Sequence, residues 1–376
     1  MAYSIGLWAR WSAVSIVFAL LSACGSVPDS FNLSDFETHE VASVTEVFVA
    51  TTRKPSDDAK RMFSDSRSSV LNFAELQVGI PDTHRPGRVE SSRRSPDPKR
   101  HFTLTGRQNI ENSTQFRGRL NDALKQLPTD KRELLIFVHG FNNNFASGVF
   151  RHAQMAHDFG VPAVALHYSW PSAGRTDGYV YDRDSAIFAR EGLAEALELA
   201  ASTNATNITL LAHSMGSLLT LEALNVLALS RDIKTLRSID TVILAAPDVD
   251  IDVFDAKFAA LHKLETNEFV ILVSGNDGAL GLSSTLRGGH PRVGQGRNNA
   301  ALQEKGIVVL DVSKIDGGGH STFAASPKLI KLIESGALEE TISSSQTNTA
   351  TSVIVDSAGD AGSLLVLLPK KVFSRR

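Results

Sequence analysis

Short apolar runs recur along the chain between longer stretches of mixed polarity. Each run is rich in Val, Ile, Leu and Ala and shows little of the apolar–polar alternation of a strand with one face in water. Near-continuous apolar runs of this length are typical of parallel strands that are buried on both faces. The runs are residues 47–51, 134–138, 163–168, 208–212, 241–245, 269–274 and 307–312. They predict a mostly parallel sheet.

The segments between these runs supply the helices. Residues 185–201, 215–229 and 253–264 have helical character. Strands and helices in alternation predict an α/β fold, with a parallel central sheet that is covered by helices on both faces. Residues 73–78 and 101–105 are interpreted as additional antiparallel strands near one edge of this sheet.

The beginning of the sequence has the pattern of a bacterial export signal. An apolar run at residues 11–23 follows Arg10 and is shorter than the roughly 20 apolar residues that a membrane-spanning helix needs. The run ends in Leu21-Ser22-Ala23-Cys24, which resembles the lipobox of bacterial lipoproteins, where the cysteine is lipidated and the chain is cut just before it. We therefore expect residues 1–23 to be a signal peptide and Cys24 to carry lipid.

Cys24 is the only cysteine of the chain, and it falls at the position that the lipobox requires. The alternative is a plain secretory signal or an N-terminal anchor in which this cysteine is incidental. Gly25 follows in place of the Asp that often retains such proteins at the inner membrane. The expected location is therefore the cell envelope, with the lipid in the outer membrane and the protein facing the periplasm. A single cysteine also excludes an intrachain disulfide and a Cys-based metal site.

The organisation of the chain follows from these signals. Residues 24–45 are polar and lack periodicity, so we interpret them as a lipidated tether, and residues 46–340 as one α/β domain. Residues 341–376 are predicted to be a flexible tail, because residues 341–360 are rich in Ser, Thr and Asn. Within that tail, residues 364–368 form a short apolar patch before a basic end. We expect the patch to dock on the domain, with a contact to anionic lipid as the alternative.

The composition excludes several classes of function. The 376 residues are 42% hydrophobic and 21% charged, which is ordinary for a protein with a sizeable core. A net charge of −3 gives no electrostatic reason to expect a nucleic-acid partner, and the basic stretch 85–100 is interpreted as a solvated loop. The sequence has no phosphate-binding glycine motif and no spacing typical of metal ligands, so no cofactor and no metal are predicted.

The segment Ile208-Thr209-Leu210-Leu211-Ala212-His213-Ser214-Met215-Gly216 is the strongest chemical signal. It reads as a strand, a serine in a tight turn, and then a helix, which is the context of a nucleophile elbow. The residues two before and two after the serine must be small because strand and helix pass closely there. Ala212 and Gly216 satisfy this requirement, with alanine replacing the usual first glycine. The alternative is an ordinary serine that caps a helix.

A serine nucleophile needs a histidine base, which follows it in the chain order of this elbow type. Three of the 11 histidines follow Ser214. His262 lies in a helical stretch, and His290 lies in a loop that no strand directly precedes. His320 follows the last strand in the glycine-rich loop Gly317-Gly318-Gly319, which would let its ring reach back over the sheet. His320 is therefore the predicted base, with His290 as the alternative.

The base needs an orienting acid. Asp277 follows the strand at residues 269–274 and is the predicted acid. The alternative is Asp248, in a cluster with Asp250 and Asp252 whose spacing also suits the cap of a following helix.

Backbone N–H groups are predicted to form an oxyanion hole. One belongs to Met215, directly after the nucleophile. The other belongs to Phe141, because the strand at residues 134–138 leads into His139-Gly140-Phe141-Asn142. His139 itself is interpreted as structural.

These stretches together resemble the α/β-hydrolase superfamily, and within it a bacterial branch of esterase- or lipase-like character that is known only as a domain of unknown function. The resemblance extends from about Val47 to His320. The matching stretches are residues 47–54, 137–142, 168–172, 212–216 and 244–250.

The resemblance implies a serine hydrolase core in which Ser214, Asp277 and His320 have the roles given above, but it implies no substrate. It also suggests that the pocket is lined by residues of a shared segment, with packing as the alternative for the aromatic ones. These residues are Trp170, Asp177, Tyr181 and Asp182.

Two functions of different classes follow from the sequence. The first is a serine hydrolase that acts through an acyl-enzyme on a small-molecule carboxylic ester, including lipid or acyl esters close to the anchoring membrane. Acyl transfer and amide cleavage would use the same residues. The second is a non-catalytic envelope lipoprotein that uses the fold for binding or scaffolding.

Overall fold

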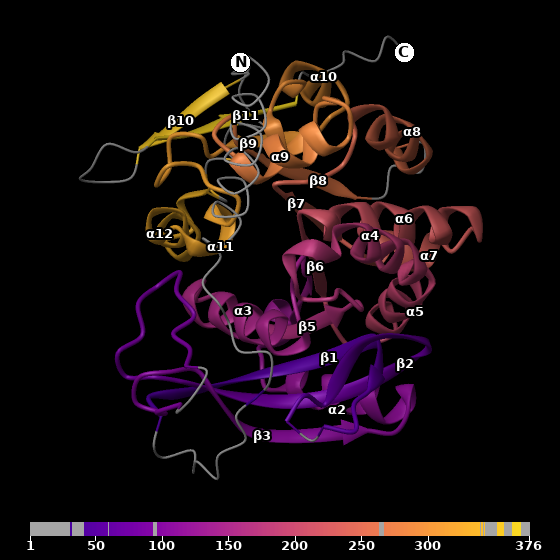
Figure 1. The fold of residues 1–376 in the computed structure, drawn as a ribbon, viewed down its shortest axis with the longest axis vertical. Helices are drawn as coiled ribbons and strands as arrows, with labels where there is room; N and C mark the ends of the chain where they lie inside the picture. The colour runs from indigo at the N-terminus through magenta and orange to yellow at the C-terminus, as the bar shows by residue number, and fades with distance from the viewer. Residues whose placement is uncertain are drawn as a thin grey trace, which may run out of the picture.

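The structure of the protein is a computed structural model (Figure 1). It describes residues 31, 41–58, 60–92, 96–262, 267–338, 340, 342, 352–356 and 363–369. The predicted signal peptide, Cys24 and most of the predicted tether lie outside the described residues. No helix in the described part is long and apolar enough to cross a membrane.

An 11-stranded sheet is the centre of the fold, and its strand order is β10-β11-β9-β8-β7-β6-β4-β5-β1-β2-β3. The strands are β1 (Ser43–Pro55), β2 (Phe63–Ile80), β3 (Thr103–Ile110), β4 (Glu133–Val138), β5 (Ala163–Ser169), β6 (Asn207–His213), β7 (Thr241–Ala245), β8 (Glu268–Val273), β9 (Val308–Asp311), β10 (Ser352–Asp356) and β11 (Ser363–Leu367). The strands from β1 to β9 in this order are parallel, and β2, β3, β11 and β10 add antiparallel pairs at the two edges.

Helices cover both faces of this sheet. The helices are α2 (Ser113–Lys125), α3 (Phe145–Asp158), α4 (Tyr179–Phe188), α5 (Arg190–Ala201), α6 (Met215–Leu229), α7 (Ile233–Ser238), α8 (Ile251–His262), α9 (Gly278–Leu286), α10 (Asn299–Glu304), α11 (Thr322–Ala325) and α12 (Pro327–Glu334), with short 3-10 helices η3 (Thr129–Lys131), η4 (Thr176–Gly178) and η5 (Val293–Gln295).

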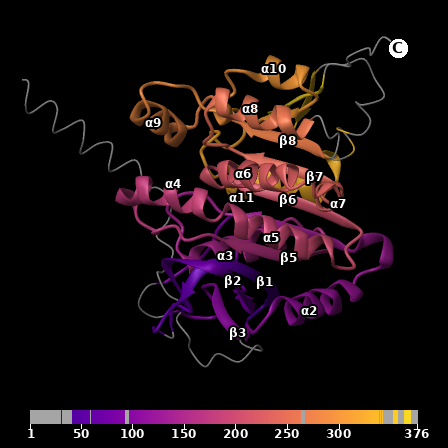
Figure 2. The same ribbon diagram turned by 90° about the vertical axis from the view of Figure 1, so that its right-hand side faces the viewer.

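Two layers of core result from this arrangement. Buried side chains of α2, α5, α6, α8 and α10 pack in one core with the sheet, and those of α3, α11 and α12 pack on the other side. Figure 2 shows α5, α6 and α8 in front of the strands, while α4 and α9 project at one end of them. That end is the one where the parallel strands finish, because α4 follows β5 and α9 follows β8.

The predicted α/β fold class is confirmed, and each predicted strand overlaps an observed one. The helix predicted at residues 185–201 is divided in two: α4 begins at Tyr179 and α5 begins at Arg190. The helices α2 and α3 were not predicted, although each begins at an asparagine whose side chain accepts a hydrogen bond from the helix backbone.

The structure differs from the flexible tail predicted at residues 341–376. Strand β11 pairs with β9, and β10 pairs with β11, so both strands belong to the central sheet. Leu364, Val366 and Leu368 are buried in the core beside α12. The physical reason is alternation with a period of two, which buries one face of a strand even in a segment of mostly polar composition. The docking of the apolar patch on the domain therefore takes the form of strand pairing.

Candidate active site

Ser214 lies in the sharp turn between β6 and α6. Its backbone has φ 53° and ψ −120°, a conformation that L-residues rarely adopt and that marks a strained turn. The turn is possible because its neighbours are small. A Cβ atom at Gly216 would lie 2.4 Å from the carbonyl oxygen of His139, and one at Gly140 would lie 2.9 Å from the Cβ of Ser214. The sequence therefore holds the serine against the loop that follows β4.

The structure brings Asp277 and His320 together. The Nδ1 atom of His320 lies 2.7 Å from Oδ2 of Asp277, which is the distance of a charge-assisted hydrogen bond. The other oxygen, Oδ1, accepts a hydrogen bond from the backbone of Leu280 at the start of α9. The Asp277 side chain is fully buried, and 20% of the His320 side chain remains exposed. The buried carboxylate of Asp277 therefore accepts two hydrogen bonds and fixes the orientation of the His320 ring, which stays partly exposed to solvent.

The loop after β9 directs His320 to this position. Gly317 and Gly318 have positive φ angles of 83° and 62°, and the Ser274 hydroxyl donates a hydrogen bond of 2.6 Å to the carbonyl of Gly318. The His213 ring donates from Nε2 to the carbonyl of His320 at 3.1 Å, and the two rings lie 4.6 Å apart. Since His213 directly precedes Ser214, this contact ties the histidine loop to the serine turn.

The alternative acid, Asp248, lies next to the serine turn, since its N–H donates to the carbonyl of Ser214 at 3.2 Å, but its carboxylate has other partners. The carboxylate of Asp248 accepts hydrogen bonds from Tyr179 and Ser283 and forms an ion pair with the buried Arg292. His290 is exposed, and its contact with Ser284 is made by its backbone carbonyl.

Asp250 of that cluster has the capping role that its spacing allows. Asp250 accepts hydrogen bonds from the backbone of Asp252 and Val253 at the beginning of α8. His262 lies at the exposed end of the same helix.

The loop after β4 presents a free backbone donor next to the serine. Asn142 has φ 58°, and its N–H donates to Asp182, while the N–H of Asn143 donates to the hydroxyl of Ser172. No acceptor for the N–H of Phe141 exists within the described residues. Met215 is the first residue of α6, where a backbone N–H has no partner inside the helix. These two N–H groups are the ones that the sequence analysis predicts for an oxyanion hole.

A buried polar cluster beneath this loop was not predicted. Asp182 accepts hydrogen bonds from the hydroxyl of Ser172 at 2.5 Å and from the N–H groups of Asn142 and Ala173 at 3.1 and 2.6 Å. Arg53 donates to the carbonyls of Asn143 and Ser172 at 2.8 and 3.0 Å. We call Arg53, Ser172 and Asp182 the loop clamp, because together they fix both sides of the loop.

Burial perturbs the charges of the loop clamp. Loss of solvent lowers the pKa of Arg53 to about 10, and the charge of Asp182 opposes this shift. Burial also raises the pKa of Asp182, against the hydrogen bonds from Ser172, Ala173 and Asn142. A buried charge is stable only when it is paired and hydrogen-bonded, so each member of the clamp depends on the others.

The other residues of the segment shared with the resembling family have different places. Trp170 is fully buried, stacks on His139 at 4.9 Å and donates a hydrogen bond to its carbonyl, which is the packing role. Asp177 lies on the surface in an ion pair with Arg175, and the hydroxyl of Tyr181 donates to the backbone of Asp65.

Tyr179 is a further site residue that the sequence did not reveal. Its ring meets that of Phe141 edge-to-face at 5.2 Å, and its hydroxyl contacts Asp248, Ser283 and Arg287. Helices α4 and α9 are thereby joined next to the site. Burial and the charge of Asp248 raise the pKa of Tyr179 to about 12, so its hydroxyl stays protonated.

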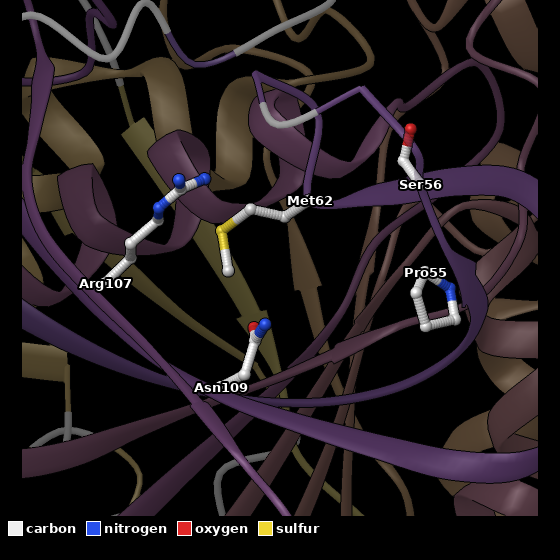
Figure 3. A pocket seen from close by; sticks show the side chains of 5 residues that line it. All are labelled: Pro55, Ser56, Met62, Arg107 and Asn109. Carbon is white, nitrogen blue, oxygen red and sulfur yellow. The ribbon is translucent and has the colours of Figure 1, made fainter.

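A separate cavity lies on the side of the antiparallel strands. Its volume is about 330 Å³, and its lining comes from the end of β1, the turn after it and β3 (Figure 3). The lining residues are Pro55, Ser56, Met62, Arg107 and Asn109. None of the residues around Ser214 contributes to it, so this cavity is not part of the candidate active site.

Comparison with known proteins places the chain in a family. Residues 112–336, more than half of the chain, match the model of the α/β hydrolases of unknown function, DUF900. The chain therefore belongs to this family of α/β hydrolases. No curated protein sequence is significantly similar to it. Among solved structures it is similar to the peroxisomal α/β-hydrolase Lpx1 of Saccharomyces cerevisiae, with 11% identity over 80% of this chain and 90% of that chain and a TM-score of 0.35.

Proposed function

We propose that this α/β hydrolase is a serine esterase that cleaves carboxylic esters through an acyl-enzyme. Ser214 is the nucleophile, His320 the general base and Asp277 the residue that orients it. The observation that carries the proposal is the 2.7 Å hydrogen bond between Asp277 and His320 beside a serine held in a strained turn. A buried carboxylate on one ring nitrogen leaves the other nitrogen to accept a proton, which is the arrangement that activates a serine hydroxyl.

The reaction proceeds in two halves. In the first, Nε2 of His320 takes the hydroxyl proton of Ser214 while the serine oxygen forms a bond to the ester carbonyl carbon. The N–H groups of Phe141 and Met215 stabilise the negative charge on the carbonyl oxygen, and the alcohol leaves with the proton from His320. In the second, water loses a proton to His320 and attacks the acyl carbon; the bond to the serine oxygen breaks, His320 returns the proton to that oxygen, and the acid is released.

Two features of the site support this chemistry beyond the three side chains. The clamp formed by Arg53, Ser172 and Asp182 occupies the N–H groups of Asn142 and Asn143, whereas the N–H of Phe141 in the same loop has no acceptor within the described residues. Burial, above all, lowers the pKa of His213 well below its usual value. A neutral His213 ring next to His320 does not repel the imidazolium that forms during attack.

The substrate class follows from the location that the sequence suggests. If Cys24 is lipidated, the site works close to a membrane surface, which favours lipid or other acyl esters as substrates. The exposed apolar side chains of Val180 on α4 and Leu286 on α9 fit this proposal, since both helices lie at the carboxyl end of the strands beside Tyr179.

A fluorophosphonate probe tests the proposal, because it reacts only with an activated serine. We expect the purified protein to be labelled, and labelling to be lost in Ser214→Ala and His320→Ala. The matched control is His290→Ala, which removes an exposed imidazole and should be labelled like the wild type.

Either of two results would contradict this assignment. Absence of labelling in a folded wild-type protein would contradict the proposed serine esterase activity and favour a binding or scaffolding lipoprotein. Labelling that survives in His320→Ala but is lost in His290→Ala would assign the base to the other histidine. Once labelling is established, a panel of acyl esters, amides and acyl acceptors separates hydrolysis of esters from amide cleavage and acyl transfer.

A further inference from the structure

A second group of ionisable side chains lies where the loop after β2 meets the end of α3. His84 belongs to the loop, and His157 and Asp158 are the last two residues of the helix. The His84 ring is bound on both sides: Nε2 lies 2.7 Å from Oδ1 of Asp158, and Nδ1 lies 2.9 Å from Oε2 of Glu90. The ring of His157 meets that of His84 edge-to-face at 5.5 Å.

The remaining oxygens of the two carboxylates are already occupied. Oδ2 of Asp158 accepts hydrogen bonds from the N–H of Gly87 at 2.7 Å and from the side chain of Gln154 at 2.6 Å. Oε1 of Glu90 accepts a bond of 3.1 Å from the N–H of Arg85. The two hydrogen bonds to Oδ2 hold the Asp158 carboxylate in place, and its other oxygen, Oδ1, faces the imidazole rings.

We propose that His84, His157 and Asp158 bind a divalent transition-metal ion of the Zn²⁺ type. One ligand atom from each of the three residues lies within 4.8 Å of the others. Two imidazole nitrogens and one carboxylate oxygen are a donor set that suits zinc, whereas Ca²⁺ and Mg²⁺ require oxygen ligands. His157 is exposed, so a fourth position remains open to water.

Glu90 does not bind the metal but hydrogen-bonds to one of its ligands, His84. A histidine that binds metal through one ring nitrogen usually donates its other N–H to a carboxylate, which orients the ring and makes it a better ligand. The bond from Nδ1 of His84 to Glu90 is of this kind. The ligand atom of His84 is then Nε2, the atom that faces Asp158.

Metal binding replaces a proton. In the metal-free protein both ring nitrogens of His84 lie within hydrogen-bond distance of carboxylate oxygens, which only accept, so the ring carries a proton on each nitrogen. When the metal binds, the Nε2 proton passes to solvent and the Nδ1 proton stays with Glu90. The distance from Nε2 to Oδ1 must lengthen from 2.7 Å to about 3.4 Å, the edge of a tetrahedral site with ordinary zinc bond lengths.

The site would act as a structural clip. It joins the loop around Gly87 to the end of α3, and Gln154 continues the contact by donating to the carbonyl of Ala324 in α11. None of its residues touches Ser214, Asp277 or His320, so the metal takes no part in the proposed ester chemistry. The sequence analysis predicted no metal, because His84 and the ligands of α3 come from separate segments and no local spacing joins them.

Calorimetric titration of Zn²⁺ into the purified protein, first stripped with EDTA, tests this site directly. We expect one ion per chain for the wild type and for Ser214→Ala, so the result does not depend on hydrolase activity. His157→Gln changes an exposed side chain, which keeps the fold intact, and should abolish this binding. Glu90→Gln should weaken it by about 10- to 100-fold. His290→Gln is the matched control and should bind like the wild type.

Thermal unfolding gives a second readout. Zn²⁺ should raise the unfolding temperature of the wild type and of His290→Gln, but not of His157→Gln. The proposal is overturned if the folded wild type binds no Zn²⁺, or if His157→Gln binds it equally well, which would mark surface association elsewhere. Equal binding of Mg²⁺ would also overturn it, because the two imidazoles would then not be ligands.

Discussion

Two histidine environments in this protein differ in what surrounds the ring. His320 lies at the carboxyl end of the strands, where it is partly exposed and bonded to the buried Asp277. His152 lies inside α3, fully buried against Phe137 and His167, and neither of its ring nitrogens has a hydrogen-bond partner in the described part of the chain. The first ring has a carboxylate as a hydrogen-bond partner, and the second ring has no partner of either charge among the described residues.

The difference teaches that a carboxylate partner decides what a histidine can do. Burial without a partner lowers the pKa of His152 to about 3, so its ring stays neutral. An unpaired buried polar group costs about 1–3 kcal/mol, which is a burden on stability without chemical use. In the proposed mechanism, the carboxylate beside His320 stabilises the imidazolium that general-base catalysis creates.

Replacing Asp277, the carboxylate partner of His320, makes the two histidine environments more alike and should have the largest effect on activity. We expect Asp277→Asn to lower kcat/KM for an activated ester on the order of 10³- to 10⁴-fold, because the ring loses its fixed tautomer and its counter-charge. Asp122→Asn, on the exposed side of α2, is the matched control and should leave kcat/KM unchanged. A loss of less than tenfold in Asp277→Asn would mean that this carboxylate does not orient the base.

The loop clamp offers a second way to sharpen the comparison, since its loop follows β4 and lies against Ser214 at Gly140. The two carboxylate oxygens of Asp182 accept three hydrogen bonds, and Asp182→Asn leaves only one oxygen to accept them. The loop that contains Phe141 should therefore move, and the N–H of Phe141 with it. We expect kcat to fall by about 10²-fold with little change in KM, because the oxyanion exists only in the transition state.

Two variants control this measurement. Asp177→Asn changes an exposed carboxylate of the same segment and should leave both constants unchanged. Ser172→Ala removes a partner of Asp182 and should lower kcat in the same direction. A change confined to KM would contradict a positioning role.

The smallest expected effect concerns stability as a function of pH. An unfolded His152 has a pKa of about 6.5, and the folded one has a pKa of about 3. Between these values only the unfolded state binds the proton, so stability falls with falling pH by up to about 1.4 kcal/mol per pH unit. In urea unfolding between pH 6 and pH 4, roughly within this window, His152→Leu should show a shallower pH dependence than the wild type. Exposed His290→Leu should keep the wild-type slope, and equal slopes for all three proteins would refute the assignment.

Much of the fold and the identity of the candidate site residues could be predicted because their signals are local. Each parallel strand is a short apolar run, and Ser214, Asp277 and His320 each follow one of these runs closely in the chain. The carboxyl ends of parallel strands meet at one edge of the sheet, so residues that follow different strands come together there.

The loop clamp and the last two strands could not be predicted in this way. Arg53 meets Asn143 and Ser172 across segments that lie 90 and 119 positions apart, and no local pattern encodes such a contact. Strand β10 lies in a segment rich in Ser and Thr, and β11 in an apolar patch of only five residues, so neither had the flanking helix that marks the parallel strands. Long-range pairing, not local propensity, decides both cases.

The pairing of β11 with β9 also sets an order of assembly during synthesis. The histidine loop leaves β9, but that strand keeps one bare edge until residues 363–367 have been made and have paired with it. The Gln303 side chain then donates a hydrogen bond to the carbonyl of Leu368, directly after β11, which fixes α10 to the end of β11. A nascent chain that has completed Ser214, Asp277 and His320 therefore still lacks the edge that holds the loop of His320. Ribosomes stalled within this interval should carry chains whose serine is not yet activated.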